Sequence, residues 1–149
     1  MSDTPNPPTV AFSLTVKSTS DALAFYSAAF NAVELFRMPA PGGGTFHAEF
    51  MLGNTRIYIS DEAESFHAKA CPEGAMAPCL FAISIDDPDA AFKQAVEAGG
   101  TPLNEPETHF WGSRTGMILD PFGYRWSLTK QVEEVAPEEI MRRAGELFG

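Results

Sequence analysis

Strict alternation of apolar and polar residues marks the start of the chain. Between Val10 and Val16 every second residue is large and apolar, which is the period of a strand with one buried face. Similar short runs, bounded by Gly, Pro, Asn and Asp, predict further strands over 32–38, 45–52, 55–60, 80–85, 101–104, 115–119 and 124–129. Most of the chain is therefore predicted to form sheets.

Helix signals interrupt the strands at two matching places. Capping residues at 18–21 predict a helix that runs to about Phe30. Asp87-Pro88 supplies an N-cap followed by proline at the first helical position, and the second helix is predicted to end at Gly99. Both helices carry an apolar stripe, formed in the first by Ala22, Leu23, Tyr26, Ala29 and Phe30.

The order strand, helix and three strands therefore occurs twice, at an offset of roughly 68 to 69 residues. This repeat predicts an α+β fold of two tandem βαβββ modules that form a concave, cup-shaped mixed sheet, followed by a C-terminal helix. The predicted boundaries are a flexible lead at 1–8, a first module at 9–60, a linker at 61–78, a second module at 79–130 and the amphipathic helix at 131–149.

Four predicted strands have one face that is small or polar. These faces carry Ala11, Ser13 and Thr15; Arg56, Tyr58 and Ser60; Leu80, Ala82 and Ser84; and Arg125, Ser127 and Thr129. They either face solvent or leave room for a ligand. We expect a ligand cavity, because the same one-sided pattern recurs on all four strands.

Composition excludes several classes of partner. The chain of 149 residues is long enough for one domain with its own core, and its formal net charge is −10. This acidity argues against nucleic acid or an anionic membrane as a partner. The two cysteines, Cys71 and Cys79, lack the spacing of a zinc site and are expected to be reduced. With no export signal and no apolar run of 18 residues, we expect a cytoplasmic protein.

The tail has a separate pattern. Pro137 lies near the start of a predicted helix whose apolar stripe is formed by Ile140, Met141, Ala144, Leu147 and Phe148. The stripe packs either on its own domain or on a second subunit, and amphipathicity alone does not distinguish these.

Few residues offer acid–base chemistry. His47 and Glu49 share one strand face at i, i+2, a spacing that suits an acid–base pair or two metal ligands and also an ordinary exposed face. His109 precedes Phe110-Trp111 in a loop, where it would line a pocket mouth. Arg114 either clamps an anionic group of a ligand or is a surface charge. The candidate catalytic residues are therefore His47, Glu49 and His109, and the sequence does not indicate which reaction they would catalyse.

The repeat and several short motifs resemble the vicinal oxygen chelate superfamily, which comprises glyoxalase I, fosfomycin and bleomycin resistance proteins and extradiol dioxygenases. The resemblance covers residues 8 to 130 and is strongest to the PhnB-like branch. The pieces that carry it are Phe25-Tyr26, Ala29-Phe30, 34–39, 47–49, 60–62, Phe110-Trp111-Gly112, 120–124, Trp126 and the tail 136–143.

This resemblance implies four inward metal ligands, typically His and Glu. The corresponding positions here carry Ala11, Tyr58, Leu80 and Ser127. Alanine and leucine cannot ligate a metal, and neutral serine and tyrosine are poor ligands. We therefore expect no metal and no other cofactor, which argues against the superfamily's metalloenzyme reactions.

These observations lead to three hypotheses. The first is a metal-free protein that binds a small organic molecule in the sheet cleft, with ligand contacts from Ser13, Tyr58, Phe110, Trp111, Arg114 and Ser127. The second is a lyase, isomerase or other enzyme that acts on a small metabolite through His47 and Glu49, through His109 or through an atypical metal. The third is a structural or regulatory dimer without a ligand. The resemblance also implies a homodimer, with modules exchanged between subunits as one arrangement.

Overall fold

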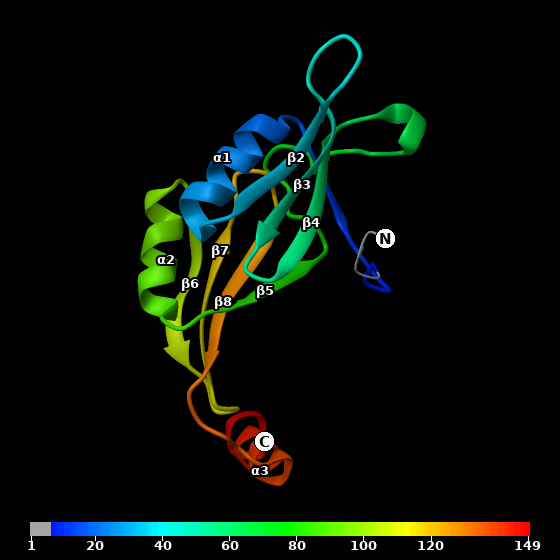
Figure 1. Cartoon of the computed structure of the whole chain (residues 1–149). Coiled ribbons are helices and arrows are strands. Elements are labelled where there is room, and N and C mark those ends of the chain that lie inside the picture. The colour runs from blue at the N-terminus through cyan, green and yellow to red at the C-terminus, as the bar shows by residue number, and fades with distance from the viewer. Residues whose placement is uncertain (1–6) are drawn as a thin grey trace, which may run out of the picture. The chain divides into compact units, whose positions relative to one another are not determined.

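The computed structural model describes residues 7–149, so most of the lead predicted at 1–8 lies outside the described residues. Its helices and strands follow the predicted order (Figure 1). They are β1 (Ser13–Val16), α1 (Thr19–Phe30), β2 (Val33–Pro39), β3 (Thr45–Leu52), β4 (Thr55–Asp61), the 3₁₀ turn η1 (Glu64–Phe66), β5 (Leu80–Ser84), α2 (Pro88–Glu97), β6 (Thr101–Thr108), β7 (Ser113–Leu119), β8 (Arg125–Gln131) and α3 (Pro137–Phe148).

The strands form two sheets with the same connectivity. The first has the order β1-β4-β3-β2 and the second the order β5-β8-β7-β6. In each sheet the first strand of the module pairs in parallel with the last, and the other neighbours are antiparallel. The predicted α+β fold of two βαβββ modules with a C-terminal helix is confirmed. Contacts divide the chain into one unit at 7–27 and 31–70 and another at 28–30 and 71–149.

Local capping explains where the two module helices begin. The side chain of Ser18 accepts a hydrogen bond from Asp21 N at 3.2 Å, and Asp87 does the same for Ala90 N at 3.1 Å. Asp87 is the N-cap that the sequence predicted, followed by Pro88 at the start of α2, and Ser18 is one of the candidates at 18–21. Helix α1 ends at Asn31, which takes the left-handed conformation with φ of 59°.

Each sheet has an apolar face. In the first unit this face holds Leu14, Val16, Ala48, Phe50, Ile57 and Ile59, all buried. Tyr26 of α1 stacks on Phe50 with 5.5 Å between ring centroids. In the second unit Ile118, Trp126 and Leu128 are buried, and Phe81 packs on Trp126 at 4.9 Å. The alternation therefore predicted the core faces of both modules.

Val10 and Phe46 depart from that alternation. Val10 is 80% exposed, because it lies before β1, which begins at Ser13. The pattern places Phe46 on the same face as Ala48, yet 41% of Phe46 is exposed. Two consecutive pairs, Met38 with His47 and Pro39 with Thr45, skip Phe46, so β3 has a bulge there. A bulge inserts an unpaired residue and turns its side chain out of the strand's alternation. The ring of Phe46 instead meets Phe66 of the turn η1, with 5.5 Å between centroids.

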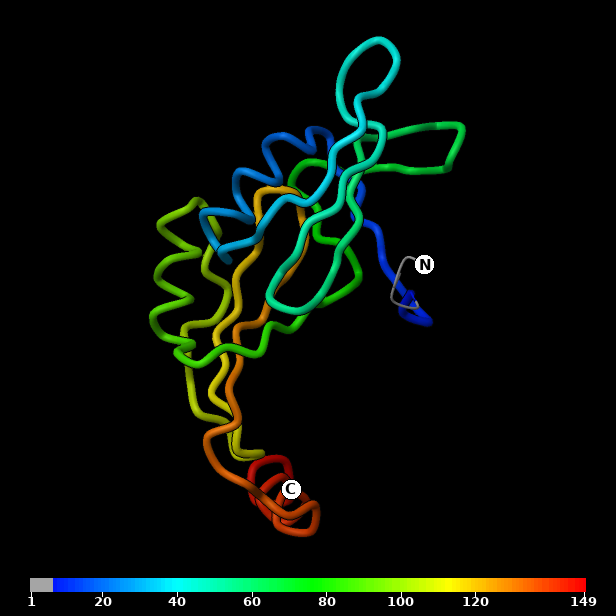
Figure 2. The backbone as a smooth tube through the Cα atoms, in the orientation of Figure 1, coloured from blue at the N-terminus to red at the C-terminus, as the bar shows by residue number. Residues whose placement is uncertain are grey.

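The turn before β8 is held by one buried carboxylate. Asp120 accepts hydrogen bonds from Phe122 N at 2.8 Å, Tyr124 N at 2.9 Å and the indole Nε1 of Trp126 at 2.9 Å. Gly123 completes the turn with φ of 95°, which is left-handed backbone that favours glycine. This Asp-Pro-Phe-Gly segment joins β7 to β8, as the tube in Figure 2 shows. It fixes the position of the strand that carries Ser127 and Thr129.

A second carboxylate organises the first module. Asp61, the last residue of β4, accepts hydrogen bonds from Thr19 N at 2.8 Å and Thr45 N at 3.0 Å. It therefore ties the start of α1 and the start of β3 to the end of β4. Partial burial raises the pKa of Asp61, but the hydrogen bonds from Thr19 and Thr45 and the charge of Arg37 outweigh it, so the pKa lies below its usual 3.8.

The C-terminal helix α3 carries its apolar residues at the surface. Met141, Leu147 and Phe148 are all exposed, and Phe148 is 80% exposed. Arg143 anchors the helix through a 2.8 Å hydrogen bond to the carbonyl oxygen of Phe110 and a 2.9 Å ion pair with Glu133. Among the described residues no helix is both long enough and apolar enough to cross a membrane.

Candidate functional site

Side chains opposite the core of the first module form a charged and aromatic surface. Strand alternation puts His47 and Glu49 of β3 on this surface, and β4 contributes Arg56 and Tyr58. Glu49 pairs directly with Tyr58 across the strands, and Met51 pairs with Arg56. We call this set, His47, Glu49, Arg56 and Tyr58, the first polar face.

The carboxylate of Glu49 is shared between two partners. Its Oε2 lies 3.1 Å from Nε2 of His47, and its Oε1 accepts from Nη1 of Arg56 at 3.1 Å. Only 19% of the Glu49 side chain is exposed, whereas Arg56 is 56% exposed. The predicted pairing of His47 and Glu49 on one face is therefore a direct contact in the structure.

Aromatic rings flank the imidazole of His47. The ring centroid of Tyr58 lies 5.3 Å from that of His47, and Phe36 of β2 lies 6.4 Å away. Ser13, a predicted ligand contact, is the parallel-strand partner of Tyr58 and is exposed. The first polar face thus brings together an imidazole, a carboxylate, a guanidinium and the ring of Tyr58, with the ring of Phe36 beside it.

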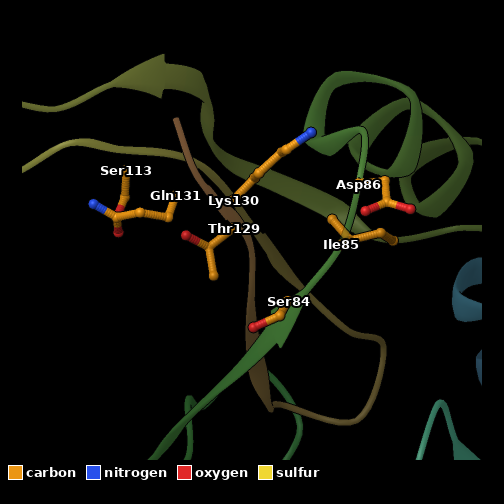
Figure 3. A pocket seen from close by; sticks show the side chains of 7 residues that line it. All are labelled: Ser84, Ile85, Asp86, Ser113, Thr129, Lys130 and Gln131. Atoms are coloured by element: carbon orange, nitrogen blue, oxygen red, sulfur yellow. The ribbon is translucent and has the colours of Figure 1, made fainter. Parts of the chain in front are cut away.

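The corresponding surface of the second module carries mainly hydroxyl and amide groups and opens into a pocket of about 580 Å³ (Figure 3). Its lining comprises Ser84, Ile85, Asp86, Ser113, Thr129, Lys130 and Gln131. Ser84, Thr129 and Gln131 lie on one side of their strands and Lys130 on the other, as strand alternation requires (Figure 3). We call the side formed by Ser84, Ser113, Thr129 and Gln131 the second polar face.

Hydrogen bonds position most of these neutral groups. The hydroxyl oxygens of Thr115 and Thr129 lie 2.8 Å apart, and Ser113 Oγ donates to Oε1 of Gln131 at 3.1 Å. Gln131 in turn donates to the carbonyl oxygen of Glu133. Within the described residues, the side chain of Ser84 makes no hydrogen bond, which leaves its hydroxyl available to a ligand. Ser127, a predicted contact two residues before Thr129, is itself buried.

The aromatic loop predicted to line the pocket mouth lies beside this face. His109 N donates to the carbonyl oxygen of Ser113 at 2.8 Å, which places the loop at the start of β7. The rings of His109 and Trp111 stack with 4.2 Å between centroids, and Trp111 is 40% exposed. The ring of Phe110 contacts Trp111, with 4.9 Å between centroids, and Phe148 of α3, with 6.0 Å. The pocket lining includes none of these three rings.

Arg114, the predicted clamp for an anionic group, has partners within the protein. Its Nε and Nη2 donate to the two carboxylate oxygens of Asp89 on α2, at 2.7 and 2.8 Å, and Nη1 donates to Thr108 Oγ1 at 3.2 Å. The hydrogen bonds from Arg114 hold the pKa of Asp89 below its usual value, and Asp89 raises the pKa of Arg114. A ligand would have to displace Asp89 to be clamped by Arg114.

The positions that the resemblance assigns to metal ligands do not fit a divalent cation. Ala11 and Leu80 have no side-chain donor atom, and both are exposed. Tyr58 and Ser127 carry neutral hydroxyl groups, which are poor ligands beside the usual His and Glu. The strand partners of Tyr58 and Ser127 are Ser13 and Ala82, which are not usual metal ligands either. Within residues 7–149, no three or more His, Cys, Asp or Glu side chains are grouped as a metal site.

Some residues of the two faces were not predicted as site residues. Ser113 and Gln131 were missed because the strands were predicted as 115–119 and 124–129, whereas β7 begins at Ser113 and β8 ends at Gln131. The sequence did contain a signal for Gln131, because this residue continues the alternation of Ser127 and Thr129. The bond from Arg56 to Glu49 depends on cross-strand register, which alternation does not reveal.

Two tandem βαβββ modules, each with a polar sheet face opposite its core, define the glyoxalase type of fold. A family model described as the Glyoxalase/Bleomycin resistance protein/Dioxygenase superfamily matches residues 9–128, and the chain belongs to this superfamily. An uncharacterized protein of Mycobacterium bovis is 34% identical over 140 residues, which cover 89% of this chain and 90% of the relative.

Solved structures agree on the fold. TioX from Micromonospora sp. ML1 is similar with a TM-score of 0.66 and 19% identity, over 83% of this chain and 99% of that one. A glyoxalase/bleomycin resistance protein/dioxygenase from Nocardioides has the same score and identity, with 91% of each chain covered. The fosfomycin resistance protein FosX from Mesorhizobium loti has a TM-score of 0.61 and 13% identity, over 95% of this chain and 99% of that one. At such identities the likeness supports the fold alone.

Proposed function

We propose that the protein binds a small organic molecule at the second polar face, without the metal that many members of its superfamily use. The observation that carries this proposal is the convergence of Ser84, Ser113, Thr129 and Gln131, from three strands of one sheet, on a pocket of about 580 Å³. A pocket of this volume lies within the range of about 300 to 1,000 Å³ that holds small ligands.

The lining indicates the chemistry of the ligand. Its groups on the second polar face are hydroxyls and an amide, which donate and accept hydrogen bonds without carrying charge. Lys130 and Asp86 add one charge of each sign to the lining. We therefore expect a polar, uncharged or zwitterionic molecule rather than a strong acid. Trp111, exposed in the adjacent loop, offers an aromatic surface for a planar part of such a ligand.

The absence of suitable ligands at the four family positions supports the metal-free part of the proposal. Ala11 and Leu80 offer no donor atoms, and Tyr58 offers only a neutral hydroxyl beside the ring of His47. The predicted contact Ser127 is buried on β8, two residues before Thr129. Tyr58 belongs to the first polar face, and Ser13 lies beside it on β1. Arg114 takes part only if the ligand displaces Asp89.

A thermal-shift screen of chelator-treated protein tests this function. Planar aromatic compounds and glycopeptides are suitable first probes, and a hit is then titrated by calorimetry. We expect Ser84→Ala and Thr129→Val each to weaken binding about tenfold, the cost of one lost hydrogen bond. Thr55→Val, at an exposed site on β4, is the matched control and keeps wild-type affinity. Equal affinity in all three variants, or no hit from the whole screen, contradicts the proposal.

Three finer assignments are also proposals. Assignment to the PhnB-like branch is supported by the motifs at 34–39, 47–49 and 136–143. A homodimer, with or without exchanged modules, is supported by the exposed apolar residues of α3. Sedimentation equilibrium tests it, and Met141→Glu is expected to shift the protein to monomer. A cytoplasmic location stays a prediction from the sequence.

A further inference from the structure

We propose that the first polar face is a proton-transfer site, at which His47 accepts a proton from a weakly acidic, planar organic molecule such as a phenol or an enol. This inference rests on the first module alone. It uses none of the residues of the second polar face, so either proposal can fail without the other.

The hydrogen bonds of Glu49 determine which nitrogen of His47 is basic. An ionised carboxylate only accepts hydrogen bonds, so the contact of 3.1 Å between Glu49 Oε2 and His47 Nε2 requires the proton on Nε2. Arg56 supports the ionised form by donating to Oε1 at 3.1 Å. The lone pair of the neutral imidazole then lies on Nδ1. Within the described residues, Nδ1 has no hydrogen-bond partner.

The side chains around His47 favour a ligand of a particular shape. Tyr58 and Phe36 place aromatic rings 5.3 and 6.4 Å from the imidazole centroid, and Met38 is the cross-strand partner of His47. Aromatic and thioether groups favour a flat, conjugated molecule over an extended polar one. With 31% of the His47 side chain exposed, the imidazole remains accessible from solvent.

The proton transfer balances within the site. The oxygen–hydrogen bond of the phenol or enol breaks, the proton forms a bond to Nδ1 of His47, and the electron pair remains on the ligand oxygen. The resulting imidazolium carries protons on both nitrogens and keeps its hydrogen bond to Glu49. Histidine suits this step because a neutral imidazole can accept a proton at one nitrogen while it donates a hydrogen bond from the other. Glu49 and Arg56 act as positioning residues. Glu49 acts on the ligand through its hydrogen bond with His47, and Arg56 acts through Glu49.

The test uses 4-nitrophenol, whose ionised form is yellow. Protein is added at a pH at which most of the free probe is un-ionised, and the absorbance of the nitrophenolate is followed. We expect a saturable rise with the wild-type chain. His47→Gln is expected to abolish the rise and Glu49→Gln to weaken it about tenfold, through loss of a charge-assisted hydrogen bond. Tyr58→Phe retains the rise, because the ring and not the hydroxyl is needed.

Two controls make the outcome decisive. His67→Gln removes an exposed histidine of the linker and is expected to leave the signal unchanged. Ser84→Ala is also expected to leave it unchanged, which separates this site from the second polar face. Folding of each variant is checked by its melting temperature. The inference is overturned if the wild-type chain gives no saturable rise, or if His47→Gln retains one while folded.

Discussion

The two modules share a strand order and differ in what they present opposite their cores. The first polar face holds His47, Glu49 and Arg56, which are ionisable and bonded to one another. The second holds hydroxyl and amide groups beside an open pocket. The buried faces, in contrast, are apolar in both modules. The repeat therefore fixes the fold through the core faces, and the opposite faces are free to carry different chemistry.

The turns that lead into the last strand of each module also differ, in this case in how tightly they are packed. In the first module β3 and β4 are joined by Gly53-Asn54, and a side chain at Gly53 would meet nothing within 4 Å. In the second, β7 and β8 are joined through Asp120 and Gly123, and a Cβ on Gly123 would lie 2.6 Å from the sulfur of Cys71. We infer that the stability of the second module depends more strongly on its turn than that of the first.

The largest expected effect comes from Asp120→Ala. This substitution leaves two backbone N–H groups and the indole N–H of buried Trp126 without their acceptor. We expect the free energy of unfolding to fall by about 4 kcal/mol, since each unsatisfied buried donor costs about 1 to 3 kcal/mol. Urea denaturation measures the loss. The exposed Asp86→Ala is the control and is expected to change stability by less than about 0.5 kcal/mol.

A smaller effect is expected when the two turn glycines are compared. Gly123→Ala forces a side chain onto left-handed backbone and against Cys71, and we expect a loss of about 2 to 3 kcal/mol. At Gly53 φ is 60° and a side chain would meet nothing within 4 Å. Gly53→Ala therefore costs only the backbone strain, and we expect stability to fall by about 1 kcal/mol. Equal losses of stability at the two positions would contradict the difference between the two hairpins.

The smallest expected effect is the pH dependence that Asp61 gives the first module. Its pKa in the folded protein lies below the usual 3.8, so its contribution is complete at neutral pH and is lost as the pH falls through the lowered pKa. We expect less than about 1 kcal/mol, because solvent screens a carboxylate this accessible. The stability difference between wild type and Asp61→Asn is measured at about pH 7 and about pH 3. A difference that grows toward acid contradicts the sign.

The sequence predicted the fold well because burial imposes a regular period. The alternation on β1, β3 and β4, the caps Ser18 and Asp87, and the apolar stripe of α1 all agree with the structure. Phe46 was misplaced because its bulge depends on the pairing with β2 rather than on local preference. The start of β7 and the end of β8 were also missed, because the pairing of these strands continues beyond the apolar run, up to the turn at 109–112.

The candidate sites were less predictable, for a physical reason. Site residues are defined by contacts between strands, and register is invisible in a period of two. His47 and Glu49 were found because they share one strand, whereas Arg56 required knowledge of the neighbouring strand. The bidentate pairing of Arg114 with Asp89 joins β7 to α2 across 25 positions and could not be inferred from either segment alone.

The central claim, that the second polar face binds an organic ligand without a metal, is tested most directly by a backbone NMR titration. The hit from the thermal-shift screen is added to ¹⁵N-labelled protein, first with a chelator present and then with excess zinc or manganese, each followed by calorimetry. We expect the amide signals of Ser84, Ser113, Thr129 and Gln131 to shift in the chelated sample, and the affinity to stay unchanged after metal is added. Binding that appears only after metal addition, or shifts confined to residues outside this face, would contradict it.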